Sequence, residues 1–164
     1  MEKFLYTDAG MFALWNKNSY KNIDEYDKWE ELFLEDETII KEIEKESFVP
    51  IYFHRDGTFK FKVNLEEELS DLEKEYMFSK SDTYIINTDG GLVLSGIEFI
   101  SNNYSEDEVL SINIEKGLYE VRLFLIEWDK EPVKEDLPDC IIKINKIVNK
   151  SENYSNKLDS FKEI

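Results

Sequence analysis

The stretch LYEVRLFLIEW at residues 118–128 carries the clearest indication of the fold. If this stretch is extended, Tyr119, Val121, Leu123 and Leu125 lie on the same face of the chain. A period of two is the period of a β-strand, because successive side chains of a strand point to opposite faces of its sheet. TFKFKV at 58–63 and VLSINI at 109–114 repeat this alternation. The pattern predicts a β-rich fold.

Further short strands are predicted around these three stretches. They lie at 51–55, 82–86, 92–99 and 140–148, with a hairpin or strand pair over 3–15. Asp56-Gly57 and Asp89-Gly90 separate β-prone runs, and Asp-Gly favours the positive φ of a type I′ turn. We therefore expect hairpins at both places. Seven or more strands joined by such turns indicate an antiparallel sandwich or barrel.

Two acidic segments have helical spacing instead. Residues 24–47 place aromatic and aliphatic side chains three or four positions apart behind the candidate N-cap Asp24, and they predict one interrupted helix or two short ones. Asp24 to Glu46 holds eleven acidic residues and three lysines. A second helix is predicted over 65–76, with six acidic residues and one lysine.

The expected fold class is therefore α+β and mainly β. We expect an antiparallel β-sandwich with one or two acidic helical insertions, in one domain over residues 1–150. The residues after it, 151–164, read as a polar C-terminal tail that frays or adds a weak helix.

Charge restricts the classes of partner. The 164 residues include 37 Asp and Glu against 20 Lys and Arg, for a net charge of −17. Direct binding to nucleic acid or to an anionic membrane is disfavoured, because both require a basic surface. No stretch is apolar for long enough to span a membrane, and the first residues lack the apolar core of a signal peptide. We expect a cytoplasmic protein.

Catalytic motifs are lacking. The sequence has no G-x-S-x-G, no P-loop and no G-x-G-x-x-G. His54 and Asp56 could form a general-base couple, but Asp56 is better explained as a turn residue. Cys140 begins an apolar strand, where a free cysteine behaves as a small hydrophobic residue. We predict no catalytic residue, no cofactor and no metal site, although an acid pair depends on the fold and stays open.

The acidic segments are also candidates for binding a protein partner. Aromatic side chains lie among the carboxylates of the first segment, and an aromatic anchor in an acidic field suits a basic partner. The alternative is a solvated helix face, which charge runs usually form. The predicted partner-binding residues are Asp24, Glu25, Tyr26, Asp27, Trp29, Glu30, Glu31, Glu66, Glu67 and Glu68.

The C-terminal part of the chain resembles a known family. Residues 109–147 contain an amphipathic strand, a Lys-Gly-x-Tyr turn, a second strand, a Pro-containing polar loop and a final Asp-x-x-Ile strand. The matching positions are Lys116, Gly117, Tyr119, Pro132, Asp139 and Ile142. This order is similar to the competence protein J family, bacterial inhibitors of a DNA-entry nuclease. The resemblance implies a twisted β-sandwich with an inhibitor or immunity role.

Composition and resemblance together favour one function among three. The first is a non-enzymatic bacterial immunity-type or inhibitor protein that binds a basic protein such as a nuclease or toxin. The second is a carboxylate-pair or metal-dependent hydrolase. The third is a small-ligand-binding or structural domain.

Overall fold

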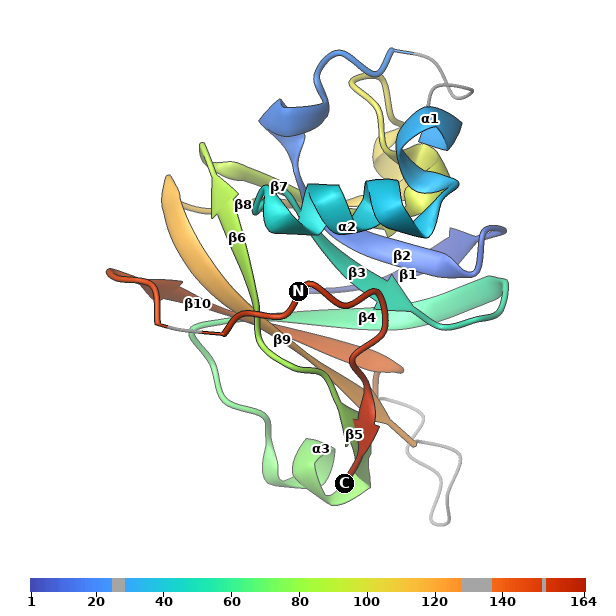
Figure 1. Ribbon diagram of the computed structural model, residues 1–164. Coiled ribbons are helices and arrows are strands. Elements are labelled where there is room, and N and C mark those ends of the chain that lie inside the picture. Colours follow the sequence, from blue (N-terminus) through green and yellow to red (C-terminus); the bar gives the residue numbers. More distant parts are fainter. Residues whose placement is uncertain (25–28, 128–136, 152) are drawn as a thin grey trace.

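Two β-sheets pack face to face in the computed structural model, and short helices cover the outer side of one of them (Figure 1). The structure describes residues 1–24, 29–127, 137–151 and 153–164. The expected class, α+β and mainly β, is confirmed. None of the described helices is long and apolar enough to cross a membrane.

The larger sheet, sheet A, contains seven strands among the described residues. Its order is β1 (Glu2–Thr7), β4 (Gly57–Leu65), β10 (Cys140–Ile147), β9 (Gly117–Ile126), β5 (Met77–Lys80) and β11 (Lys162–Glu163), and β6 (Tyr84–Thr88) also pairs with β9. The smaller sheet, sheet B, has the order β3 (Phe48–Tyr52), β2 (Met11–Asn16), β7 (Gly91–Gly96) and β8 (Leu110–Asn113). Neighbouring strands are antiparallel, as expected, except that β4 and β10 are parallel.

The first acidic segment forms two short helices, α1 (Trp29–Phe33) and α2 (Asp36–Glu44), which is one of the two expected arrangements. The second forms only α3 (Asp71–Tyr76), because Leu65 still belongs to β4. Ser70 begins α3 with a capping box, in which its hydroxyl accepts from Glu73 N and Glu73 accepts from Ser70 N. The predicted strand 92–99 ends at Gly96, and the 3₁₀ helix η3 (Ile97–Phe99) follows.

The predicted hairpins are wrong, since their turns join the two sheets. β3 pairs with β2 in sheet B, whereas β4, beyond Asp56-Gly57, pairs with β1 and β10 in sheet A. The turns from β1 to β2 and from β6 to β7 also change sheets. Glycines with positive φ, 140° at Gly57 and 128° at Gly90, do occupy these turns. These glycines allow the chain to reverse its direction, but they do not determine which strands pair with each other.

Burial explains which strand enters which sheet. β2 is buried along its whole length, because Phe12 packs on Phe61 of sheet A while Trp15 packs on Tyr20 on the outer side. β4 instead alternates buried phenylalanines with partly exposed lysines. α1 and α2 cover the outer side of sheet B, so both faces of sheet B are apolar. The outer face of sheet A is mixed, because its lysines lie beside a second, smaller apolar cluster that Phe124 of β9 forms with α3.

The C-terminal residues lie along sheet A, whereas the sequence led us to expect fraying or a weak helix. β11 pairs with β5, and the backbone N–H of Ser155 donates to Thr83 O at 2.9 Å. The Tyr84 hydroxyl donates to Lys157 O at 2.6 Å and lies 2.9 Å from the Ser160 hydroxyl. These contacts add the end of the chain to the sandwich.

Candidate functional site

The two acidic segments predicted to bind a partner lie at different ends of the sandwich. Figure 1 shows α1 and α2 beside sheet B, in the upper half of the view, and the chain between β4 and α3 below sheet A. Glu30 and Glu31 therefore belong to one surface, and Glu66, Glu67 and Glu68 to another. A partner that covers one segment does not automatically reach the other.

The surface around α1 and α2 carries several exposed carboxylates that have no counter-ion among the described residues. We call it the acidic helical face, formed by the exposed residues Asp24, Glu30, Glu31, Leu34, Glu35, Asp36 and Glu37. Glu30, Glu31 and Glu35 make no ion pair with any residue that the structure describes. Of the predicted residues, Glu25, Tyr26 and Asp27 lie outside the described residues, as does the side chain of Trp29.

Leu34 is an apolar residue of this face that the sequence did not single out. It is 63% exposed and follows α1 directly, between Glu30 and Glu31 on one side and Glu35 on the other. Phe33 turns into the core, where it stacks on Phe48 with ring centroids 5.3 Å apart. The signal was the run Leu32-Phe33-Leu34, since a helix cannot turn three consecutive residues to the same side.

Part of the negative charge of the second acidic segment is paired with lysines of the same molecule. Glu68 Oε1 lies 2.5 Å from Lys143 Nζ on β10, and Glu73 Oε1 lies 2.8 Å from Lys62 Nζ on β4. Glu66 accepts a hydrogen bond from the backbone N–H of Lys146. These lysines hold the segment against the outer face of sheet A, so its negative charge is partly used for folding.

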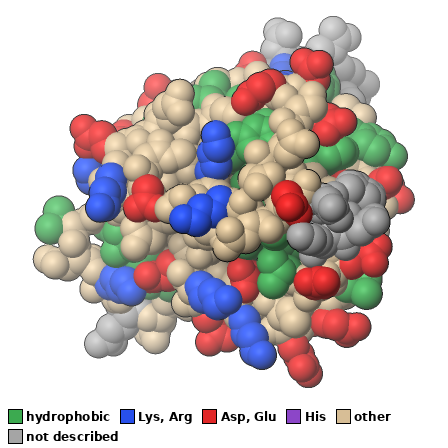
Figure 2. Space-filling model, turned by 90° about the horizontal axis from the view of Figure 1, so that it is seen from above, with side chains coloured by type: hydrophobic (Ala, Val, Ile, Leu, Met, Phe, Trp, Pro, Cys, Tyr) green, Lys and Arg blue, Asp and Glu red, His purple; other side chains and the backbone are tan. Residues whose placement is uncertain are grey.

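Figure 2 shows how charge is distributed over the end of the molecule that carries α1. Asp and Glu side chains spread over the whole of this face, whereas most Lys and Arg side chains lie on one half of it. The other half, which includes α1, is predominantly acidic. A positively charged surface of another molecule would therefore be attracted to that half.

His54 lies in an open groove of about 990 Å³ at another edge of the sandwich. Its Nε2 lies 2.7 Å from Asp159 Oδ2, so its carboxylate partner is Asp159 and the suggested couple with Asp56 is wrong. The imidazole also stacks on Tyr52, with centroids 3.9 Å apart. These contacts tie the β3–β4 turn to the C-terminal segment.

Cys140 and Glu98 are two further residues whose side chains could react, and the structure explains both by burial. Cys140 is completely buried, and burial raises the pKa of its thiol, which makes a thiolate unfavourable. Burial, and after it the neighbouring Asp8 side chain, raises the pKa of Glu98. Glu98 does not line the groove that holds His54. No group of three or more His, Cys, Asp or Glu side chains forms a metal site within the described ranges.

Comparison with known proteins gives a likeness of fold. No protein-family model matches the chain, and no curated protein does. The crystal structure of ComJ from Bacillus subtilis, an inhibitor of the DNA-degrading activity of NucA, is similar with a TM-score of 0.56 at 15% identity, over 90% of this chain and 96% of ComJ. A protein described as crocagin biosynthetic gene J is similar with a TM-score of 0.59 at 15% identity, over 88% of this chain and 95% of that one. The suspected resemblance to the ComJ fold is confirmed.

Proposed function

We propose that this protein is a non-enzymatic inhibitor of the immunity type, which binds a basic nuclease or toxin through the acidic helical face. The observation that carries the proposal is a set of exposed carboxylates, Glu30, Glu31 and Glu35 among them, with no counter-ion among the described residues. The likeness in fold to ComJ, an inhibitor of the nuclease NucA, supports the same class of partner.

Charge repulsion on the acidic helical face favours a basic partner. Carboxylates crowded without counter-ions repel one another and lower the stability of the folded protein. A partner's lysines and arginines would remove that repulsion and accelerate association. Exposed Leu34, surrounded by these carboxylates, would supply the apolar contact at the centre of the interface.

The direct test measures DNA degradation by NucA and by any nuclease encoded beside the gene for this chain, with increasing amounts of the protein. We expect inhibition that is complete near one equivalent and that weakens as salt rises, because charge attraction is screened over about 8 Å at physiological ionic strength. Undiminished degradation by every nuclease tested would contradict the proposal and favour the ligand-binding or hydrolase alternatives.

A pair of double variants locates the interface. Glu30→Lys with Glu31→Lys reverses two charges on the acidic helical face, while Glu67→Lys with Glu75→Lys reverses two exposed charges at the other end of the molecule. We expect the first to slow association strongly and the second to leave it nearly unchanged. The opposite order would place the partner on the 66–75 segment, where the sequence also predicted contacts.

Leu34→Ala tests the apolar anchor. The side chain is exposed, so truncation should leave the melting temperature nearly unchanged while weakening inhibition about tenfold. Leu72→Ala on α3, where the leucine is also exposed, is the matched control. Equal inhibition by both variants would remove Leu34 from the interface.

A further inference from the structure

The outer face of sheet A carries a row of cations that crosses five neighbouring strands. The row consists of Lys62 on β4, Lys143 on β10, Arg122 on β9, Lys80 on β5 and Lys162 on β11. Lys143 lies directly opposite Arg122, and Lys162 directly opposite Lys80. Lys80 also lies opposite Phe124, two residues from Arg122, so both cations point to the same face. In a chain of net charge −17, this row is a local exception.

At one end of the row, the lysines form ion pairs with carboxylates of the same chain. Glu73 pairs with Lys62 at 2.8 Å, and Glu68 pairs with Lys143 at 2.5 Å. At this end each cation therefore has an oxyanion partner, supplied by the segment between β4 and α3. The arrangement shows which kind of group this face of the sheet binds.

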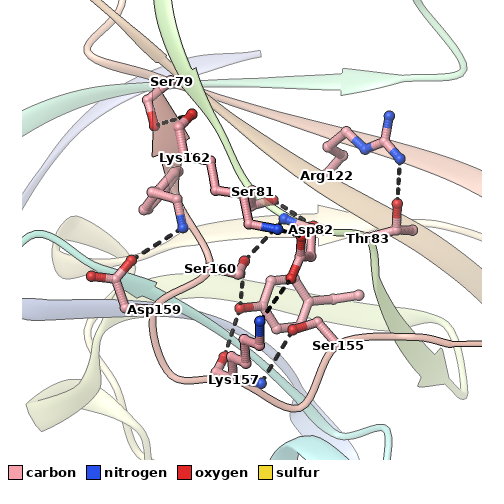
Figure 3. Close-up of polar contacts among 12 residues, drawn as sticks. Ser79, Ser81, Asp82, Thr83, Arg122, Ser155, Lys157, Asp159, Ser160 and Lys162 are labelled. Carbon is pink, nitrogen blue, oxygen red and sulfur yellow. Dashed lines mark hydrogen bonds and ion pairs between the residues drawn. The ribbon is translucent and has the colours of Figure 1, made fainter. Parts of the chain in front are cut away.

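The other end of the row opens into a pocket of about 620 Å³, which Arg122, Lys80, Lys162 and Thr83 line. Figure 3 shows the Arg122 guanidinium and Thr83 pointing toward one another, and this hydrogen bond uses one of the five guanidinium N–H donors. Arg122 has no carboxylate partner, and Lys80 has no polar partner, among the described residues. Two cations of the row thus remain available.

The carboxylates that face the pocket are already bound. Asp82 lies 3.0 Å from Lys162 Nζ and 3.9 Å from Lys157 Nζ, and it appears beside Lys157 in Figure 3. Glu120 accepts from the Tyr154 hydroxyl at 2.9 Å. Neither carboxylate pairs with Arg122 or Lys80, so an incoming anion does not have to displace an ion pair of these two residues.

We propose that this pocket binds a small oxyanion of the phosphate class, held between the Arg122 guanidinium and the Lys80 ammonium. A planar guanidinium donates two parallel hydrogen bonds to such an anion, and a lysine adds a point charge. The chain as a whole carries a net charge of −17, which repels polyanions, so the ligand is one phosphoryl group. Its source is either free phosphate or the phosphate of a nucleotide.

Backbone amide NMR of the full chain tests this, with sodium phosphate titrated at constant ionic strength. We expect saturable shifts confined to residues 80–84, 122 and 154, and an affinity that falls about tenfold in Arg122→Gln and again in Lys80→Gln. Arg55→Gln and Lys116→Gln remove the same charges from exposed positions outside this pocket and should bind as the natural protein does.

Titrations with a nucleoside monophosphate and with acetate, compared with phosphate, identify the source of the anion. Tighter binding of a nucleoside monophosphate than of phosphate would identify a nucleotide, and equal binding would identify free phosphate. Shifts that do not saturate, an equal loss in Arg55→Gln, or tighter binding of acetate than of phosphate would each overturn the proposal. Arg122 and Lys80 are exposed, and a thermal melt of each variant verifies folding.

Discussion

The hydroxyl oxygen of Thr7 lies 2.9 Å from both carboxylate oxygens of Glu98, and this contact joins the end of β1 in sheet A to η3, which follows β7 of sheet B. The backbone N–H of Asp8 donates to the same carboxylate at 2.9 Å. Glu98 is only 2% exposed, so these donors replace its lost hydration. The carboxylate therefore fixes the turn at which the chain passes from one sheet to the other.

Glu98→Gln should change how stability depends on pH. Burial, followed by the neighbouring Asp8, raises the pKa of Glu98 from 4.5 to about 7. The folded state thus binds this proton more tightly than the unfolded state, and the contribution of Glu98 to stability falls as pH rises from about 4.5 to about 7. The unfolding free energy of the variant should improve relative to the natural protein by up to about 3 kcal/mol over that interval.

Urea unfolding at a series of pH values measures this effect. Glu108→Gln, at an exposed glutamate, is the matched control, and its unfolding free energy should stay close to that of the natural protein. A difference between Glu98→Gln and the natural protein that does not change with pH would contradict the raised pKa of Glu98.

Gly96→Ala should destabilise the same turn. A Cβ at Gly96 would lie 1.8 Å from Glu98 Oε1 and 3.0 Å from the carbonyl oxygen of Tyr6. Glu98 would have to leave its position beside Thr7, at an expected cost of about 1–3 kcal/mol. Gly91→Ala is the control, because the nearest atom to its Cβ would be 3.7 Å away. Equal melting temperatures for the two variants would contradict this account.

Tyr84→Phe should loosen the C-terminal segment. The variant loses the hydroxyl that donates to Lys157 O, at a cost of about 1 kcal/mol. Hydrogen exchange should accelerate at residues 155–164 and stay unchanged in β9. Tyr119→Phe is the control, because it removes a hydroxyl that donates at the same distance, 2.6 Å, to Glu115 O, which lies outside this segment. Unchanged exchange in Tyr84→Phe would show that the hydroxyl does not hold the segment in place.

Lys62→Gln should destabilise the protein at neutral pH. Burial alone would raise the pKa of Glu73, but the Lys62 ammonium and the hydrogen bonds with Ser70 hold it below its usual value of 4.5. This depressed pKa contributes stability above about 4.5 that is lost as pH falls through the lower value of the folded state. Without Lys62, the Glu73 charge stays buried, 3% exposed, and we expect a loss of about 1–3 kcal/mol.

Lys143→Gln provides the comparison for Lys62→Gln. The Lys143 partner, Glu68, has a side chain that is 75% exposed, so solvent screens this ion pair and Lys143→Gln should lose less stability than Lys62→Gln. Denaturant unfolding of both variants and of the natural protein, at neutral pH and near pH 3, measures how much stability each substitution removes. The deficit of Lys62→Gln should shrink in acid, and a deficit that stays constant would contradict the assignment to Glu73.

The sequence by itself determined the local elements of this protein. Strict alternation in TFKFKV, with lysines outward, predicted β4, and the alternation after Gly117 predicted β9. Helical spacing predicted α1 and α2. These features depend on residues a few positions apart, whose side chains alternate or recur with the geometry of the backbone. The same information, together with the resemblance to competence protein J, identified a mainly β fold with acidic helical insertions.

Only the tertiary structure decided which strands share a sheet and which carboxylates remain free. A turn at Asp56-Gly57 has the same residues whether its strands pair or separate, and the separation follows from burial, because FVPIY at 48–52 is apolar on both faces while β4 is not. The charge of Glu68 is met by Lys143, 75 residues away, whereas Glu30 and Glu31 find no such lysine among the described residues. Contacts at this separation depend on the packing of whole sheets, so no local pattern of residues reveals them.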